Sequence, residues 1–276
     1  MNALGFLYDT APGRLLLKGL TKPALSRAAG RLLDAPVSRM LIGPFARKNG
    51  ICLSDYVAED YRCFNDFFCR RIRPELRPLP EDARVLFAPC DGLLSAYRIR
   101  EGLVLPIKQS RYTIDELLHY DAAARRYADG ICLVFRLCVQ HYHRYCYLDD
   151  GQKGLNVYLP GVLHTVRPIA LEHLPVFVRN CREYTLMQTE HFGLAAQIEV
   201  GAMLVGRILN LDGPGPIRRG AEKGRFLYGG STVVLLLEKD AAEVDEGFFA
   251  ATAEGRETPV TLGQPLGRSL RAQAVH

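Results

Sequence analysis

Apolar runs separated by charged and glycine-rich stretches divide the chain into a helical first part and a strand-rich remainder. Val233–Leu237 is uniformly apolar and bounded by polar residues, which predicts a fully buried strand. Ile131–Leu148 is longer and rich in aromatic and β-branched residues, so it predicts a central strand. Ile198–Ile208 predicts a further buried strand whose glycines permit close backbone approach. Within Leu86–Tyr97, the pair Asp91-Gly92 is typical of a hairpin turn.

The segment Ala11–Lys48 combines leucines with many cations and predicts two or three short amphipathic helices, each beginning near a proline. This segment contains a single acid, Asp34. Its basic residues are Arg14, Lys18, Lys22, Arg27, Arg31, Arg39, Arg47 and Lys48. Surface helices of a globular bundle would look similar, but the scarcity of acids favours a peripheral anchor on anionic lipid. Aromatic residues are sparse in this segment, so we expect no nucleic-acid partner.

Length and composition are those of a packed protein with one large domain or a core with a helical appendage. The chain has 276 residues, and 48% of them are hydrophobic. It has no apolar run of the ~18 residues that a membrane span needs, and Met1–Thr10 lacks the features of a signal peptide, so we expect a cytoplasmic protein. The eight cysteines include no Cys-x-x-Cys pair and are expected to be reduced.

These patterns together predict an α+β fold. We expect N-terminal amphipathic helices in residues 1–62, followed by a β-rich core of mainly antiparallel sheets in residues 63–276.

The candidate nucleophile is Ser231, which follows Gly229 and Gly230 and directly precedes the most apolar strand. Its hydroxyl lies within a few atoms of the Gly230 carbonyl, which no side chain shields, so the chain can attack its own backbone. The alternative is an ordinary glycine turn that leads into a core strand. The run from Gly224 to Leu236, with its Gly-Ser-Thr, resembles the self-cleavage segment of phosphatidylserine decarboxylases.

Further motifs resemble this family in order along the chain, between about Phe64 and Gly267. Phe67-Phe68-Cys69-Arg70 resembles its Phe-Phe-x-Arg, in a short helix that we expect to end at Pro74 with arginines facing solvent. Pro89-Cys90-Asp91-Gly92 resembles its Pro-x-Asp-Gly. His141-Tyr142-His143-Arg144-Tyr145-Cys146 resembles its Asp-Tyr-His-Arg-x-His, with His141 in place of the aspartate and Cys146 in place of the second histidine.

The resemblance implies a covalent pyruvoyl cofactor, derived from Ser231 when the chain cleaves itself between Gly230 and Ser231 with the help of Asp91 and a histidine. The family's usual proton shuttle is the histidine that Cys146 replaces, so this role stays open among His143, His164 and the Cys146 thiolate. The candidate catalytic residues are therefore Ser231, Asp91, His143 and His164, and His143 is the candidate that later returns a proton to the substrate.

Candidate substrate-binding residues are Tyr142, Arg179 and Arg182. Either arginine could hold a phosphate or carboxylate, or could instead form a structural pair with Glu183. A metal site at His141, His143 and Cys146 would lack a fourth ligand, so we expect no metal.

The implied activity is decarboxylation of phosphatidylserine, in which the pyruvoyl group forms a Schiff base with the substrate amine and releases carbon dioxide to give phosphatidylethanolamine. The implied partners are phosphatidylserine, an anionic membrane surface and the chain's own fragments, 1–230 and 231–276, as a heterodimer. A homodimer is left open. The implied location is the cytoplasmic face of the cell membrane, with peripheral attachment.

Two other functions remain open at this point. One is a pyruvoyl-dependent decarboxylase of a soluble amino acid, against which the basic segment Ala11–Lys48 argues. The other is a non-processing lipid-binding relative, disabled by His141 and Cys146. A serine hydrolase is not favoured, because a nucleophile elbow would need a glycine at the position of Val233.

Overall fold

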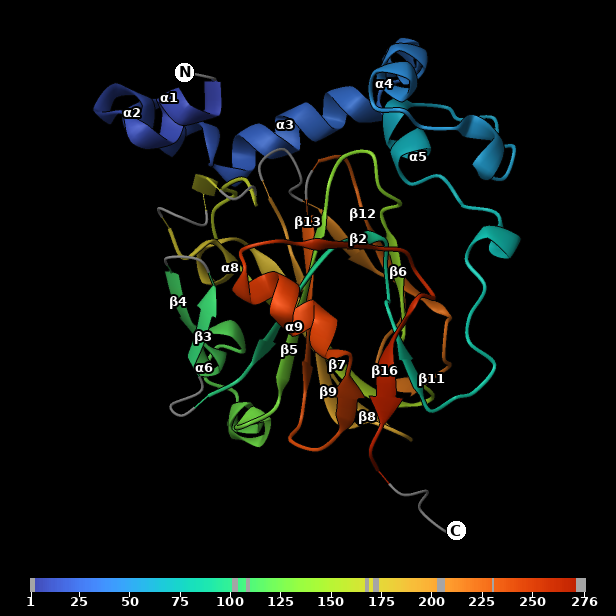
Figure 1. The fold of residues 1–276 in the computed structure, drawn as a ribbon. Helices are drawn as coiled ribbons and strands as arrows, with labels where there is room; N and C mark the ends of the chain where they lie inside the picture. The colour runs from blue at the N-terminus through green and yellow to red at the C-terminus, as the bar shows by residue number, and fades with distance from the viewer. Residues whose placement is uncertain are drawn as a thin grey trace.

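A computed structural model of the chain describes residues 3–100, 104–107, 110–166, 169–170, 174–202, 207–229 and 231–271. It contains helices, most of them in the first part of the chain, and mostly antiparallel strands, which confirms the α+β class (Figure 1). The helices and 3₁₀ helices (η) are α1 (Ala3–Asp9), α2 (Ala11–Leu20), α3 (Pro23–Asp34), η1 (Pro36–Leu41), α4 (Ile42–Lys48), η2 (Leu53–Asp55), α5 (Phe64–Phe68), η3 (Pro74–Leu76), α6 (Ile114–Leu117), η5 (Ala122–Tyr127), α8 (Val176–Arg179) and α9 (Glu246–Ala253). The strands are β1 (Val85–Phe87), β2 (Gly92–Arg98), β3 (Val104–Ile107), β4 (Ser110–Thr113), β5 (Ile131–Leu137), β6 (Arg144–Cys146), β7 (Gly151–Leu159), β8 (Arg182–Thr189), β9 (Gly193–Val200), β10 (Ile208–Asn210), β11 (Gly215–Ile217), β12 (Glu222–Phe226), β13 (Ser231–Leu237), β14 (Ala242–Val244), β15 (Thr258–Val260) and β16 (Pro265–Ser269).

Strand β13 lies in the interior of the largest sheet. Within the described residues this sheet has eight strands in the order β11-β7-β8-β9-β13-β5-β2-β15, and each neighbouring pair is antiparallel. Thr232 lies opposite Val200 of β9 and Arg136 of β5, so both edges of β13 are hydrogen-bonded. The buried strand predicted at Val233–Leu237 is confirmed.

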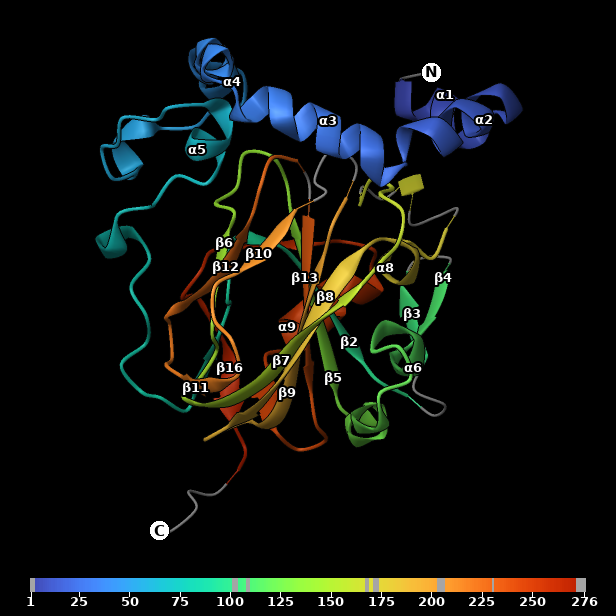
Figure 2. The ribbon, with the colours of Figure 1, turned by 180° about the vertical axis from the view of Figure 1, so that it is seen from behind.

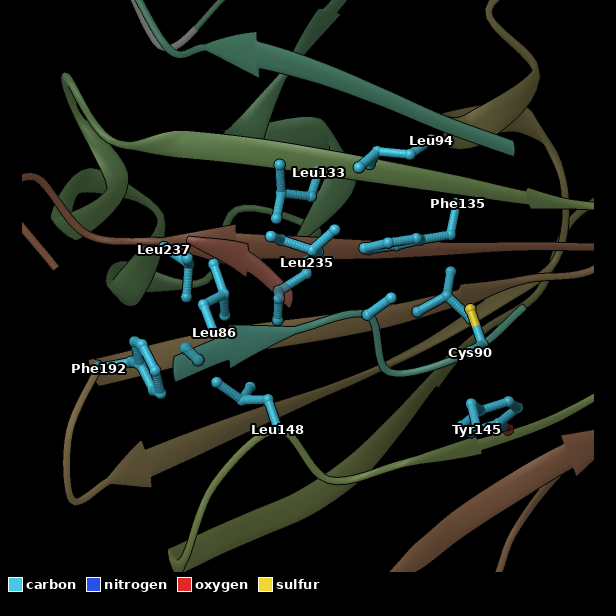
Figure 3. Close-up of a cluster of buried hydrophobic side chains, with 14 of the residues drawn as sticks. Leu86, Cys90, Leu94, Leu133, Phe135, Tyr145, Leu148, Phe192, Leu235 and Leu237 are labelled. Atoms are coloured by element: carbon cyan, nitrogen blue, oxygen red, sulfur yellow. The ribbon is translucent and has the colours of Figure 1, made fainter. Parts of the chain in front are cut away.

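Alternate side chains of β13 enter two different hydrophobic cores. Val234 and Leu236 pack in a core on one face of the sheet. Val233, Leu235 and Leu237 pack in a second core on the other face. Figure 3 shows Leu235 of that second core between the large sheet and β1, with Leu86 facing it. Both faces of β13 are therefore removed from water, which explains why its sequence is an unbroken apolar run.

The N-terminal helices cross one end of the large sheet, where β13 begins (Figures 1 and 2). The first turns of α2, α3 and η1 each contain a proline, as the sequence predicted. Ser38 joins this region to α5, because its hydroxyl accepts from the Phe64 backbone N–H at 2.8 Å. None of the described helices is long and apolar enough to cross a bilayer. The division into residues 1–62 and 63–276 stays a prediction.

The single strand predicted at Ile131–Leu148 is wrong, because the chain turns in its middle. Strand β5 ends at Leu137, and a turn follows in which His141 N–H donates to the Cys138 carbonyl at 2.9 Å. The chain then enters β6, which pairs with β12 in a separate sheet. The turn brings residues 138–143 to the end of the large sheet at which β13 begins.

Three other local predictions also need correction. Asp91-Gly92 is not a hairpin turn, because β1 pairs with β16 while β2 pairs with β5 and β15. Helix α5 ends at Phe68, and Pro74 begins η3 instead of ending that helix. The strand predicted at Ile198–Ile208 is two strands, since β9 ends at Val200 and β10 begins at Ile208, with 203–206 outside the described residues.

We expect Leu235→Ala to lower the free energy of unfolding by about 2–5 kcal/mol, because it leaves a cavity at a fully buried position of the central strand. Urea unfolding of the variant and the parent at the same pH measures the change. Leu32→Ala is the control, since Leu32 is 72% exposed and its truncation should change stability by less than about 0.5 kcal/mol. Equal losses in the two variants would contradict the central position of β13.

Candidate active site

Ser231 is the first residue of β13 and is fully buried, opposite Leu137 at the end of β5. Its hydroxyl has no hydrogen-bond partner among the described residues. Gly229, two residues earlier, has a φ of +130°, a backbone conformation that residues with a Cβ atom disfavour. Gly230, the other half of the predicted cleavage site, lies outside the described residues. An unpartnered buried hydroxyl is costly, and such groups cluster where they serve chemistry.

His143 is fully buried beside this segment. Its Nδ1 lies 2.9 Å from the His141 carbonyl oxygen and therefore carries the proton in the neutral ring, while Nε2 has no partner among the described residues. The Phe68 ring lies 4.1 Å from the imidazole, centre to centre. Burial lowers the pKa of His143 to about 3, the Arg70 guanidinium acts in the same direction, and the backbones of His141 and Gly229 oppose both. His143 is therefore a neutral imidazole at pH 7.

Helix α5 holds the chain just before the glycines. The side-chain oxygen of Asn65 accepts from the Tyr228 backbone N–H at 3.2 Å. The amide nitrogen of Asn65 in turn donates to Asp34 of α3 at 2.8 Å. The rings of Phe64 and Phe68 each lie 5.2 Å from the Tyr228 ring, edge to face. These contacts fix the entry into β13 from the α5 side.

Asp91 lies at the start of β2, where Arg77 holds it through two hydrogen bonds of 2.8 and 2.6 Å. The same carboxylate accepts from the Leu262 backbone N–H at 2.8 Å. Asp91, His141 and Tyr142 line one pocket of about 310 Å³. Burial lowers the pKa of His141, and the charge of Asp91 acts in the opposite direction. Among the described residues Asp91 makes no hydrogen bond to His143 or His164, and His141 is the imidazole whose pKa its charge influences.

The chain matches the protein family described as phosphatidylserine decarboxylase over residues 64–268. It is 39% identical over 96% of its length to phosphatidylserine decarboxylase proenzyme 2 of Clostridium acetobutylicum, of which 91% is covered. Similar values hold for the phosphatidylserine decarboxylase proenzymes of Clostridium botulinum strain 657, at 37% identity over 96% of this chain and 92% of the relative, and of Ruminiclostridium cellulolyticum, at 38% over 97% and 91%. This chain belongs to the phosphatidylserine decarboxylase family.

The two departures from the family's histidine motif have distinct surroundings. Cys146 is buried, and its thiol points to the Pro89 carbonyl at 3.5 Å. Burial raises the pKa of Cys146 to about 12, so this thiol does not supply a thiolate at neutral pH. At His141, Nδ1 accepts from the Cys138 backbone N–H at 3.1 Å. Neither residue of this decarboxylase-family chain therefore presents an unoccupied, buried base to the Ser231 segment, as His143 does.

His164 lies beneath α1. The Tyr8 hydroxyl approaches its Nδ1 at 3.3 Å, and its backbone N–H donates to Asn180 at 2.9 Å. Burial lowers the pKa of His164 to about 4, and nearby Arg179 acts in the same direction. Arg179 itself is exposed, and its side chain has no hydrogen bond or ion pair among the described residues, so it stays a candidate for anion binding.

The substrate-binding role predicted for Arg182 does not fit its contacts. Its guanidinium is buried and donates to three carbonyl oxygens, those of Leu117 at 2.9 Å, Val178 at 2.6 Å and Glu116 at 2.6 Å. The predicted pair with Glu183 is not formed either, because Glu183 accepts from Asn210. Arg182 joins α6 and α8 to β8, and its donors are occupied.

Arg70 is the residue of the site that sequence reasoning missed. The prediction that the arginines after α5 face solvent is wrong for Arg70, which is fully buried. Its signal was its place in the Phe-Phe-x-Arg motif.

Within the described residues, no three His, Cys, Asp or Glu side chains come together as metal ligands.

The two buried neutral histidines predict a loss of stability on acidification. The unfolded chain binds protons at His143 and His164 below about pH 6.5, whereas the folded chain does so only near their lowered pKa values of about 3 and 4. Each should cost about 2 kcal/mol of unfolding free energy between pH 7 and pH 5. In urea unfolding at both pH values, the free energy of unfolding of His143→Gln should fall by about 2 kcal/mol less than that of the parent between pH 7 and pH 5.

His119 provides the control for this measurement, because it is an exposed histidine and its positive φ of 54° is tolerated by asparagine. His119→Asn should leave the difference between pH 7 and pH 5 as it is in the parent. An unchanged difference in His143→Gln would contradict a neutral buried ring.

Proposed function

We propose that the chain is a phosphatidylserine decarboxylase that cleaves itself before Ser231 and uses the modified Ser231 as its cofactor. Family membership supports the activity, and the relatives bear the name proenzyme. The observation that carries the proposal for the site is that the Ser231 hydroxyl and the His143 Nε2 are both buried and both without a partner among the described residues, while the Gly229 backbone, two residues before Ser231, acts on the His143 ring. Ordinary glycine turns do not leave two reactive groups unsatisfied.

Self-cleavage begins when the Ser231 hydroxyl attacks the Gly230 carbonyl while His143 Nε2 takes the hydroxyl proton. The His143 imidazolium then gives this proton to the Ser231 nitrogen as the Gly230–Ser231 amide bond breaks, which leaves an ester between the Gly230 carbonyl and Ser231 Oγ. Loss of the α-proton of residue 231 expels the Gly230 carboxylate and leaves a carbon–carbon double bond at residue 231. Its enamine tautomerises to an imine, and water replaces the nitrogen, which leaves as ammonia. The products are residues 1–230 and a fragment that begins with a pyruvoyl group.

The surroundings of Ser231 fit such a group, because the position is fully buried and the residues just before it, Tyr228 and Gly229, lie beside aromatic rings and an uncharged imidazole. A pyruvoyl carbonyl supplies an electron sink for the amine-bearing carbon from which carbon dioxide departs. Phe68 keeps water from the His143 ring by packing on its face. His143 holds the proton at Nε2 that it returns to the substrate α-carbon, which is the role expected of it from the family pattern.

The two fragments would stay together as a heterodimer. Residues 231–271 contribute β13 to the middle of the large sheet, β15 to its edge beside β2, and β16 between β1 and β14. Removing this fragment would expose the apolar residues on both faces of β13. A decarboxylase acting on a soluble amino acid is less consistent with the exposed apolar surface of the N-terminal helices.

Ser231→Ala should leave one full-length chain, because alanine has no hydroxyl to attack Gly230. Denaturing electrophoresis and intact mass should show two fragments for the parent, cut between residues 230 and 231. Thr232→Ala is the matched control. Thr232 is equally buried, and its hydroxyl also has no partner among the described residues, yet the Thr232→Ala chain should still cleave itself. An uncut parent that decarboxylates phosphatidylserine would overturn the cofactor assignment.

We also propose that α2, α3 and η1 bind an anionic membrane surface. Their exposed apolar side chains are Leu15, Leu16, Leu20, Leu32, Val37, Met40 and Leu41. Exposed cations stand among them, including Arg14, Lys18, Arg31 and Arg39. Leucines interleaved with cations suit insertion at the boundary between anionic headgroups and acyl chains. These helices cross the end of the sheet that holds Ser231, which would place the site near its lipid substrate.

The double variant Leu15→Glu with Leu16→Glu should bind vesicles containing phosphatidylserine roughly a hundredfold more weakly, since each inserted leucine contributes about 1.5 kcal/mol. Vesicle co-sedimentation measures the binding, which should also fall as salt rises. The control changes Leu155 and Tyr158 to glutamate, because both are exposed but belong to strand β7 and not to these helices. If both double variants bind as the parent does, the helices are not the membrane surface.

A further inference from the structure

Arg70 of the Phe-Phe-x-Arg motif has no role in the chemistry proposed above, yet residues of this motif surround His143. Phe68 packs on the imidazole at 4.1 Å. Arg70 is fully buried, and its guanidinium lies over the rings of Tyr56 at 4.3 Å and Phe67 at 5.0 Å. A cation held between two aromatic rings is fixed in position without a carboxylate partner.

The hydrogen bonds of Arg70 lead to the loop that carries His143. Its Nη2 donates to the Tyr56 hydroxyl at 3.1 Å and to the carbonyls of Gln140 at 3.1 Å and His141 at 3.4 Å. The His141 carbonyl is the same oxygen that accepts from His143 Nδ1 at 2.9 Å. Arg70 and His143 are therefore joined through one acceptor, and both are removed from water.

We propose that Arg70 is the positioning residue of the active site: it fixes the carbonyl that orients His143 and thereby leaves Nε2 available as the base. The base role rests on the self-cleavage proposed above, whereas the orientation and charge of the ring do not. The groups that face the ring are the Arg70 cation, the His141 imidazole, the Phe68 face and the Gly229 backbone. None of these described groups is an anion, and it is the backbones of His141 and Gly229 that act against the guanidinium.

Histidine NMR of the uncleavable Ser231→Ala chain tests the orientation directly. With Arg70 present, His143 should give the signal of a neutral ring protonated at Nδ1 from pH 8 to pH 5, and comparison with His143→Gln assigns it. Arg70→Met should move the titration midpoint by at least one pH unit toward the ordinary value of about 6.5 and mix the two tautomers. Arg70→Gln, which keeps an N–H donor but no charge, is the variant to use where Arg70→Met does not fold.

Arg71 offers a control one residue away. Its side chain is 63% exposed and pairs only with Glu59 among the described residues, so Arg71→Met should leave the His143 signal unchanged. A His143 midpoint and tautomer in folded Arg70→Met or Arg70→Gln equal to those of the parent would overturn the proposal.

The pH profile of self-cleavage, measured with Ser231 restored, separates positioning from a merely structural role. The parent and Arg71→Met should cleave at similar rates at pH 8 and pH 4.5. Arg70→Met should lose about a quarter or more of its pH 8 rate at pH 4.5, because a midpoint of about 4 or higher leaves at least that fraction of His143 protonated. A parent that stays uncut while the NMR outcome holds would refute self-cleavage and leave the positioning role intact. A cut parent with a flat profile in Arg70→Met would refute the positioning role alone.

Discussion

The pairing of β13 on both edges is the constraint on which the rest of the structure depends. An interior strand has its register fixed by two neighbours, so its first residue, Ser231, is held at one depth opposite Leu137. Residues 227–229 lie outside any strand, and the described ladder of β13 begins at Ser231. A backbone break before Ser231 would therefore remove none of the described strand pairing, and the core on both faces would still hold the two pieces together.

Helix α5 is the element through which the N-terminal helices reach the reactive segment. Its Asn65 bonds Asp34 of α3 on one side and the Tyr228 backbone on the other. Its Phe68 touches both Tyr228 and His143. A displacement of α3 at a membrane surface would therefore reach Tyr228, the residue before Gly229, through Asp34 and Asn65. The short length of α5 suits this position, because its residues contact different partners on every side.

Sequence reasoning was most successful where the signal was local. The apolar run after Ser231 has one interpretation as a buried strand, and the helices after Pro12, Pro23 and Pro36 have local start signals. Asp91-Gly92 also has the local signal of a hairpin. The strands on its two sides do not pair with each other, because β1 pairs with β16 and β2 pairs with β15, each more than a hundred residues away. No local pattern encodes such pairing. Long-range pairing decided this position.

The buried arginines could not be predicted for the same reason. Charge patterns predict that arginine lies at the surface, because burial of a guanidinium is unfavourable unless hydrogen-bond acceptors from other segments contact it. Arg70 finds the carbonyl of Gln140, 70 positions along the chain, and Arg182 finds that of Leu117, 65 positions back. Family resemblance marked both positions, but it did not distinguish an arginine that binds substrate from one that supports the fold.

The exchange of histidine and cysteine within the family motif has a consequence for how the site would work. Cys146 is buried against Pro89 with a raised pKa, and His141 already uses Nδ1 to accept from Cys138. His164 is bound by Tyr8 beneath α1. Of these candidates in the described part of the chain, His143 has the buried ring nitrogen without a partner. The proton taken from Ser231 during cleavage and the proton given to the substrate afterwards would then pass through one imidazole. Such an arrangement needs a ring that returns to the same neutral tautomer after each step, and a fixed carbonyl acceptor at Nδ1 imposes that tautomer.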